Sequence, residues 1–394
     1  MKAIIHIGTP RTGTTSIQNF MVKNREDLHK QGIFYPTSAY WGTGNHIEFA
    51  AAAFVPNSPV DLRWFTPMLK KGFTTTDQNK VWEKCRREIE TTCNKDDVVI
   101  FSCEAFAGFD ERGIERVREL IFPLFDDVSI ILYLRRQPEW FASLYSNYVR
   151  SGGRYEVFFD HHGYNANLEQ IVTYWSIFGK DKIKIRIFDR LEFHNNDLLS
   201  DFAKTADFDI TRLGRVEPLN ETMDSAETEF LRLLNSHIHH IHHKIELNNR
   251  PYDFERWKLA NSLLEYSLKH AEKNKKSYYL NRTEARQILE QYREGNDYVA
   301  REYLGREKLF DEDVSMYPEE VASPHGLTPE RCAEITAHLW KERSSVIYQL
   351  RQENQNLKTT LSSSRRIGHF ISYFIPKEKN RKRFRAKYGY GNEN

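Results

Sequence analysis

Short apolar runs alternate with helical patterns along the N-terminal half of the chain. Four of these runs have the length and continuous hydrophobicity of buried strands: residues 3–7, 98–103, 128–134 and 183–188. Between them, apolar side chains recur three and four positions apart, as at Ile17, Phe20 and Met21, and this period predicts helices. Strands and helices that alternate in this way predict an α/β fold around a central parallel sheet.

The C-terminal part has a different pattern, which predicts a helical extension. Thr328 and Pro329 are typical of a helix cap and first turn, and a charged segment with scattered apolar residues continues through Leu361. Because its heptads are not sustained, this segment predicts a packing helix or a weak coiled coil and leaves the oligomeric state open. A second, shorter apolar stripe follows at helical spacing and ends at Pro376: Ile367, Phe370, Ile371, Phe374 and Ile375.

The basic residues are concentrated at the C-terminal end. The whole chain has 57 Lys and Arg against 55 Asp and Glu, but residues 358–394 carry a net charge of +8 and residues 1–357 carry −6. The basic run beside an amphipathic stripe predicts association with an anionic membrane surface through residues 365–387. The alternative is a helix docked on the domain with a solvated tail. Nucleic acid is disfavoured, because no base-reading motif accompanies the charge.

Composition excludes several classes of protein. A content of 40% hydrophobic and 13% aromatic residues argues against a disordered or fibrous chain. Four cysteines make no disulfide framework and have no zinc-binding spacing. The apolar runs are too short to span a membrane, and the run at residues 3–7 is too short for a signal-peptide core. We therefore expect a cytoplasmic protein, peripheral on the cytoplasmic face of the membrane if the tail binds there.

A phosphate-binding pattern follows the first predicted strand. Residues 8–16 are GTPRTGTTS, and the spacing from Gly8 to Gly13 is that of a P-loop, whose backbone N–H groups and helix dipole favour an anion. A P-loop that binds nucleoside triphosphates has Lys after the second glycine, where this chain has Thr14, so ATP or GTP chemistry is disfavoured. The nearest cation is Arg11. An ordinary strand–turn–helix is the alternative.

A second candidate for phosphate binding follows the predicted strand at residues 128–134. Arg135 lies directly after this strand, and Ser143 lies eight residues later in a helix that begins near Pro138. In open α/β sheets, ligands bind at the carboxyl ends of the strands. A guanidinium and a hydroxyl that converge at this edge would suit a second phosphate group.

Taken together, the two motifs resemble those of sulfotransferases that use 3′-phosphoadenosine 5′-phosphosulfate (PAPS). Residues 9–15 are similar to the loop that binds the 5′-phosphosulfate, and Arg135 with Ser143 is similar to the motif that binds the 3′-phosphate. The resemblance is to bacterial enzymes that act on glycans and covers roughly residues 1–315. It implies the following PAPS-binding residues: Pro10, Arg11, Thr12, Gly13, Thr14, Thr15, Ser16, Arg135 and Ser143. We do not find the family's third phosphate-contacting motif.

The resemblance also implies a fold and a reaction. It implies a three-layer, P-loop-like α/β domain at residues 1–318, with a helical insert at about 222–315 and a helical extension at 319–394. The reaction would be in-line transfer of a sulfuryl group from PAPS to a hydroxyl or amine of a carbohydrate or glycolipid-type acceptor, with no metal required. There are two alternatives. One is a P-loop kinase or NTPase, and the other is a non-catalytic protein that binds membranes or polyanions through its tail.

Three residues are candidates for the chemistry. The family loop usually has Lys where this chain has Arg11, and Arg can stabilise charge on the bridging oxygen but cannot readily donate a proton. Glu104 follows the apolar run at 98–103, and glycan sulfotransferases commonly use a Glu near here as general base. The alternative for Glu104 is to orient the substrate or to pair with an Arg. His46 is the second candidate for the base, and His6 is expected in the core.

Two further clusters resemble sites but are expected to have other roles. Five histidines lie at helical spacings between His237 and His243, yet no Cys or nearby carboxylate completes a metal site, so a solvated helix face or a glycan contact is favoured. An aromatic stretch predicts either sugar stacking or loop packing: Tyr155, Phe158, Phe159 and Tyr164.

Overall fold

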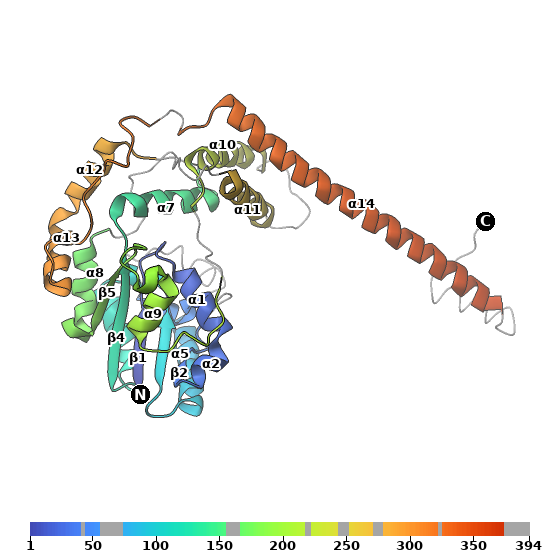
Figure 1. Ribbon diagram of the computed structural model, residues 1–394. Coiled ribbons are helices and arrows are strands. Elements are labelled where there is room, and N and C mark those ends of the chain that lie inside the picture. Colours follow the sequence, from blue (N-terminus) through green and yellow to red (C-terminus); the bar gives the residue numbers. More distant parts are fainter. Residues whose placement is uncertain are drawn as a thin grey trace. The chain divides into compact units, whose positions relative to one another are not determined.

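The computed structural model is an α/β protein built around one parallel sheet (Figure 1). It describes residues 1–40, 44–55, 74–154, 166–216, 222–242, 252–270, 279–321 and 325–373. By its internal contacts the chain forms two compact units, residues 1–327 and 328–394. The boundary predicted from the sequence lies between residues 318 and 319.

The sheet has five strands in the order β2-β3-β1-β4-β5, and every neighbouring pair is parallel. The strands are β2 (Ile33–Phe34), β3 (Val98–Ser102), β1 (Lys2–His6), β4 (Asp127–Leu134) and β5 (Ile183–Ile187). β1 pairs with β3 and β4 and is buried from Ala3 onward, which explains its continuous hydrophobicity. The predicted α/β class with a central parallel sheet and a helical C-terminal extension is confirmed.

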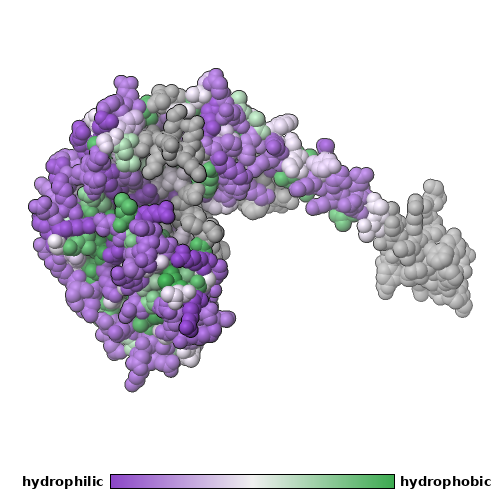
Figure 2. Space-filling view, in the orientation of Figure 1, coloured by the Kyte–Doolittle hydropathy of each residue, from purple (hydrophilic) through white to green (hydrophobic). Residues whose placement is uncertain are grey.

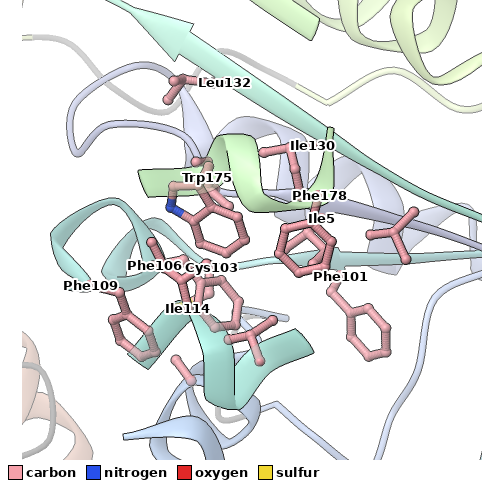
Figure 3. Packing of buried hydrophobic residues seen from close by; sticks show 14 of the residues in the cluster. Ile5, Phe101, Cys103, Phe106, Phe109, Ile114, Ile130, Leu132, Trp175 and Phe178 are labelled. Carbon is pink, nitrogen blue, oxygen red and sulfur yellow. The ribbon is translucent and has the colours of Figure 1, made fainter. Parts of the chain in front are cut away.

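Helices cover both faces of the sheet. Along β1, Ile5 packs in one hydrophobic layer and Ile4 in the other, as the two-residue period of a strand requires. The first layer includes α3 (Ile47–Ala53), α5 (Thr75–Thr92), α6 (Glu111–Ile121) and α8 (Leu168–Trp175). The second includes α1 (Thr14–Lys23), α2 (Arg25–His29) and α9 (Leu198–Ala206). In Figure 3, Trp175 lies beside Phe106 in the first layer, with their ring centroids 6.0 Å apart.

The connections between strands change direction at β1 and β3. After β1 the chain moves to β2 at one edge of the sheet, whereas after β3 it crosses to β4 on the other side of β1. Such a reversal is the switch point at which open α/β sheets bind ligands, outside the carboxyl ends of the strands. The loops after β1 and β3 therefore form the edge at which a site is expected.

A third hydrophobic cluster joins α7 (Gln137–Arg150), which follows β4, to α12 (Arg282–Gln291) from later in the chain. Two neighbouring elements, α13 (Arg293–Val299) and the π-helix η6 (Ala300–Leu304), contribute Val299 and Ala300 to the first layer instead. The helix α10 (Ser225–His242) packs against α7 and α11 (Tyr252–His270). The amides of Gln137 and Asn296, both buried, exchange hydrogen bonds of 2.8 and 3.1 Å between α7 and α13. Short 3₁₀ turns complete the fold: η2 (Glu104–Gly108), η3 (Ser176–Phe178), η4 (Lys180–Lys182) and η5 (His194–Asn196).

The second unit contains one long helix, α14 (Pro329–Tyr373). Thr328 caps it, because its Oγ1 accepts a hydrogen bond of 3.1 Å from the backbone N–H of Arg331. The helix is continuous across residues 361–367, where the sequence pattern changes from one apolar stripe to the next. The side chains of that second stripe, and residues 374–387 of the basic tail, lie outside the described residues. In the described part of the chain, no helix is long and apolar enough to cross a membrane.

Candidate functional site

Close neighbouring atoms leave no room for a side chain at Gly8 or Gly13, the two glycines at the ends of the β1–α1 loop. A Cβ on Gly8 would lie 2.6 Å from Cγ2 of Thr14, which is closer than real side chains approach. Gly13 has φ +75°, in the left-handed region, and a Cβ there would collide with Leu198 and lie 3.0 Å from the ring of Phe188. The Gly-x4-Gly spacing therefore reflects close packing of the loop against α1 and α9.

Three hydrogen bonds fix the path of this loop. Thr9 Oγ1 donates to the carbonyl of Tyr133 at 3.0 Å, and Thr12 Oγ1 donates to the carbonyl of Thr9 at 2.6 Å. Trp140 Nε1 on α7 donates to the carbonyl of Pro10 at 2.6 Å. Because the hydroxyl of Thr12 is buried and engaged within the loop, a ligand would meet its backbone rather than its side chain. The N–H of Ser16 donates to the carbonyl of Gly13 at 3.0 Å, and the positive end of the α1 helix dipole at this loop favours an anion.

Arg11 brings the two sequence motifs together. It has φ +68°, an uncommon conformation for a residue with a side chain. Its Nε donates to Oγ of Ser143 at 2.9 Å, and its carbonyl accepts a hydrogen bond of 3.0 Å from Nη1 of Arg135. A hydroxyl that accepts one hydrogen bond can still donate another, so Ser143 keeps a donor for a ligand. Arg11 therefore connects the loop motif to both Arg135 and Ser143.

Arg135 lies half-buried at the end of β4. Burial lowers its pKa, while Glu139 and Tyr317 act in the opposite direction, and a guanidinium remains charged at neutral pH. The guanidinium lies over the ring of Phe188, 5.4 Å from its centroid. A cation with restricted access to water interacts strongly with an anion, which suits Arg135 to phosphate binding.

Glu104 lies two residues beyond β3, at the same edge of the sheet. Burial raises the pKa of its carboxyl, while hydrogen bonds from its own backbone, Gln18 and Asn45, together with the charge of Arg11, limit the rise. The distances to Glu104 Oε2 are 3.1 Å from Gln18 Nε2 and 2.9 Å from Asn45 Nδ2. A carboxylate with a raised pKa, held in place and facing a cation, has the properties of a general base.

A chain of buried polar groups connects Glu104 to the core. Gln18 Nε2 also contacts Ser102 Oγ at 3.3 Å, and this oxygen lies 2.8 Å from Nδ1 of His6. His6 is fully buried, as expected, and burial lowers its pKa to about 3. The sequence analysis missed Gln18 and Asn45 as partners of Glu104. One signal was available, because Gln18 is a polar residue directly beside the apolar stripe of α1.

The structure argues against His46 as a general base. The ring is fully buried, and its Nδ1 accepts a hydrogen bond of 3.0 Å from the backbone N–H of Ser102. The proton therefore lies on Nε2, which donates to the carbonyl of Pro36 at 3.2 Å. Burial lowers the pKa of His46 to about 4. With both nitrogens bound to backbone, His46 instead joins β3 to the segment before α3.

The other predicted clusters are only partly described. His237 lies on α10 with its Nδ1 2.8 Å from the carbonyl of Leu233, whereas the remaining histidine side chains of that cluster lie outside the described residues. The aromatic stretch at 155–164 also lies outside them. Within the described part of the chain, no group of three or more His, Cys, Asp or Glu could hold a metal ion.

Comparisons with known proteins give few matches. No protein-family model matches the sequence. An uncharacterised protein of Archaeoglobus fulgidus is 29% identical over 237 residues, a match that spans 57% of this chain and 60% of that protein. Among solved structures, a sulfotransferase from Alicyclobacillus acidocaldarius superposes with a TM-score of 0.36 and 13% identity, over 61% of this chain and 96% of that one. The fold class therefore rests on the strand order and helix layers described above.

Proposed function

We propose that this chain is a sulfotransferase that transfers a sulfuryl group from PAPS to an acceptor hydroxyl or amine. The proposal is supported chiefly by the junction of Arg11 with Ser143 and Arg135, which joins the two phosphate-binding motifs at the switch point of the sheet. The β1–α1 loop and the start of α1 bind the 5′-phosphosulfate, and Arg135 and Ser143 bind the 3′-phosphate.

In this proposal, Arg11 and Glu104 act on opposite sides of the transferred group. Glu104 takes the proton of the acceptor hydroxyl as its oxygen bonds to sulfur. The bond from sulfur to the bridging oxygen breaks, and adenosine 3′,5′-bisphosphate leaves. Arg11 stabilises the negative charge that develops on the bridging oxygen. Because the sulfuryl group carries less charge than a phosphoryl group, positioning and these side chains suffice without a metal.

The acceptor is a carbohydrate or a glycolipid-type molecule, and the enzyme acts in the cytoplasm or at the cytoplasmic face of the membrane. This part of the proposal is supported by the sequence resemblance and by the +8 charge of residues 358–394. Supplying labelled PAPS to extracts of the host's glycans and lipids would identify the acceptor. A chain that sulfates only free phenols or small alcohols would contradict the carbohydrate assignment.

A ligand-induced thermal shift tests the donor directly. We expect adenosine 3′,5′-bisphosphate to raise the melting temperature, and Mg·ATP to leave it unchanged, because Thr14 replaces the lysine of nucleoside-triphosphate loops. The reverse result would support a kinase or NTPase. If neither nucleotide binds, while anionic vesicles bind only when residues 365–387 are present, the protein is a non-catalytic membrane binder.

A further inference from the structure

The helix α14 exposes a row of large apolar side chains. Half of the large hydrophobic residues that are exposed in the described part of the chain belong to this one helix. Figure 2 shows green patches between purple residues along the part of α14 that it colours. Five of these hydrophobic residues of α14 are more than half exposed, and all but Tyr348 lie on or near one line: Trp340 at 76%, Leu350 at 58%, Leu357 at 69% and Leu361 at 57%. A row of this kind on a helix indicates a partner.

The exposed residues follow a heptad repeat. With Ile347 at position a, the a positions at seven-residue intervals are Trp340, Ile347, Asn354 and Leu361, and the d positions include Leu350 and Leu357. The heptad pattern is interrupted by Asn354, which is polar, and by Arg343, which occupies one d position. The apolar members are exposed, and their register places them on one face of the helix.

The polar residue Asn354 indicates what kind of partner such a seam would bind. A single Asn at an a position of an otherwise apolar seam pairs with its counterpart in a parallel, in-register dimer, and it selects that arrangement at some cost in stability. A lipid surface or an apolar groove would gain nothing from an amide in the middle of the stripe. The polar residue therefore favours a second copy of this helix as the partner.

The charges that flank the seam agree with this arrangement. In a parallel coiled coil, a g residue faces the e residue five positions later on the partner helix. Here Glu353 occupies a g position and Lys358 the following e position, so two opposite-charge pairs form across the dimer, on either side of the seam just after Asn354. An antiparallel pair would lose this match, because g then faces g and e faces e.

We propose that two copies of this chain associate through a parallel, two-stranded coiled coil formed by residues 340–361 of α14. This dimer is independent of the proposed sulfuryl transfer, whose residues all lie in the first unit. The apolar a and d side chains bury one another, Asn354 fixes the register, and Glu353 with Lys358 sets the orientation.

Light scattering on the full-length protein tests the association. We expect a mass of twice the 46.6 kDa of one chain, falling to one chain when Leu357→Glu places a charge in the seam. The matched control is Tyr348→Glu. Tyr348 is also exposed, at 64%, but it occupies a b position that points away from the seam, so we expect this variant to remain dimeric. A wild-type monomer at tens of micromolar, or a dimer that survives Leu357→Glu, would overturn the proposal.

Cross-linking tests the orientation. In a parallel, in-register dimer the two Asn354 residues face each other, so Asn354→Cys forms an intermolecular disulfide under mild oxidation, with wild type as the control for the four natural cysteines. Glu353→Lys weakens the dimer, and adding Lys358→Glu restores it. If Asn354→Cys does not cross-link, the parallel seam is wrong. Likewise, if wild type is a monomer that binds anionic vesicles through Leu350 and Leu357, a membrane is the partner.

Discussion

At the scale of single residues, Glu104 is the group on which the proposed chemistry depends. Glu104→Gln keeps the size of the side chain but removes its ability to accept a proton. We expect turnover to fall by roughly 10²–10⁴-fold, the usual contribution of a general base, while nucleotide affinity stays near that of wild type. Initial rates and the nucleotide-induced thermal shift measure the two effects, with Glu111→Gln on α6 as an exposed control. Full turnover in Glu104→Gln would place the base elsewhere.

We expect Gln18 to set the pH at which Glu104, the proposed base, acts. Its hydrogen bond favours the charged carboxylate, so it opposes the rise in pKa that burial causes. Removing it in Gln18→Met raises the pKa further, and the acid limb of kcat/KM moves to higher pH. Rates measured across the pH range test this shift. Gln291→Met, on the exposed side of α12, leaves the profile in place. If Gln18→Met lowers thermal stability without moving the limb, Gln18 has only a structural role.

Arg135 is expected to act on nucleotide binding rather than on the chemical step. A hydrogen bond to a charged group contributes about 1.5–3 kcal/mol, so Arg135→Ala should weaken the binding of adenosine 3′,5′-bisphosphate by roughly one to two orders of magnitude. Calorimetric titration measures this change. Arg116→Ala removes a cation from the surface of α6, where Arg116 pairs with Glu119, and leaves the affinity unchanged. Equal affinities for wild type and Arg135→Ala would refute the assignment.

The positions of residues that follow strand ends could be predicted from the sequence. Arg11, Arg135 and Glu104 each follow an apolar run, and parallel strands bring their carboxyl ends to one edge. The partners Gln18 and Asn45 could not be identified in the same way, because each reaches Glu104 from a separate element. His46 shows the opposite problem, in which the sequence suggests a catalytic group that the structure does not support. A loop histidine near glycines resembles a general base until its two backbone hydrogen-bond partners are seen.

At the scale of elements, the β1–α1 junction depends on one glycine. An alanine at position 13 would have to adopt a left-handed conformation, which costs about 1–2 kcal/mol, and its Cβ would collide with Leu198. Gly13→Ala should therefore lower the melting temperature and weaken nucleotide binding together. Gly108→Ala is the matched control, since nothing lies within 4 Å of an added Cβ there. A Gly13→Ala protein with normal stability and affinity would show that the loop is not built as described.

The long strands and their helices were predictable because their periodicity is strong. β2 was not predicted, because Ile33–Phe34 is too short to give a pattern. A helix that begins at Thr328 and Pro329 was predicted, but the continuity of α14 across residues 361–367 was not, because a change of apolar stripe resembles a change of element. That segment contains no proline or glycine before Gly368, so nothing in it forces the helix to end.

At the scale of the whole molecule, the chemistry and the proposed self-association belong to different units. A protein that ends at Leu327 keeps every residue proposed for nucleotide binding and catalysis. We expect it to retain the thermal shift with adenosine 3′,5′-bisphosphate and to be monomeric in light scattering. The full-length Leu357→Glu variant is its control, because it should be monomeric with the second unit still attached. Loss of nucleotide binding in the truncated protein alone would show that α14 contributes to the site.

The length of α14 also sets a distance. At 1.5 Å per residue, its 45 residues extend about 67 Å, so the start of the basic tail is held that far from the first turn of the same helix. Adding or removing seven residues would change this reach by about 10 Å and keep the seam in register. A change of two residues would instead turn the two halves of the seam to opposite sides of the helix, because each residue rotates the helix by about 100°. Reach in this helix is therefore adjustable only in steps that keep the seam on one face, whatever surface the tail meets.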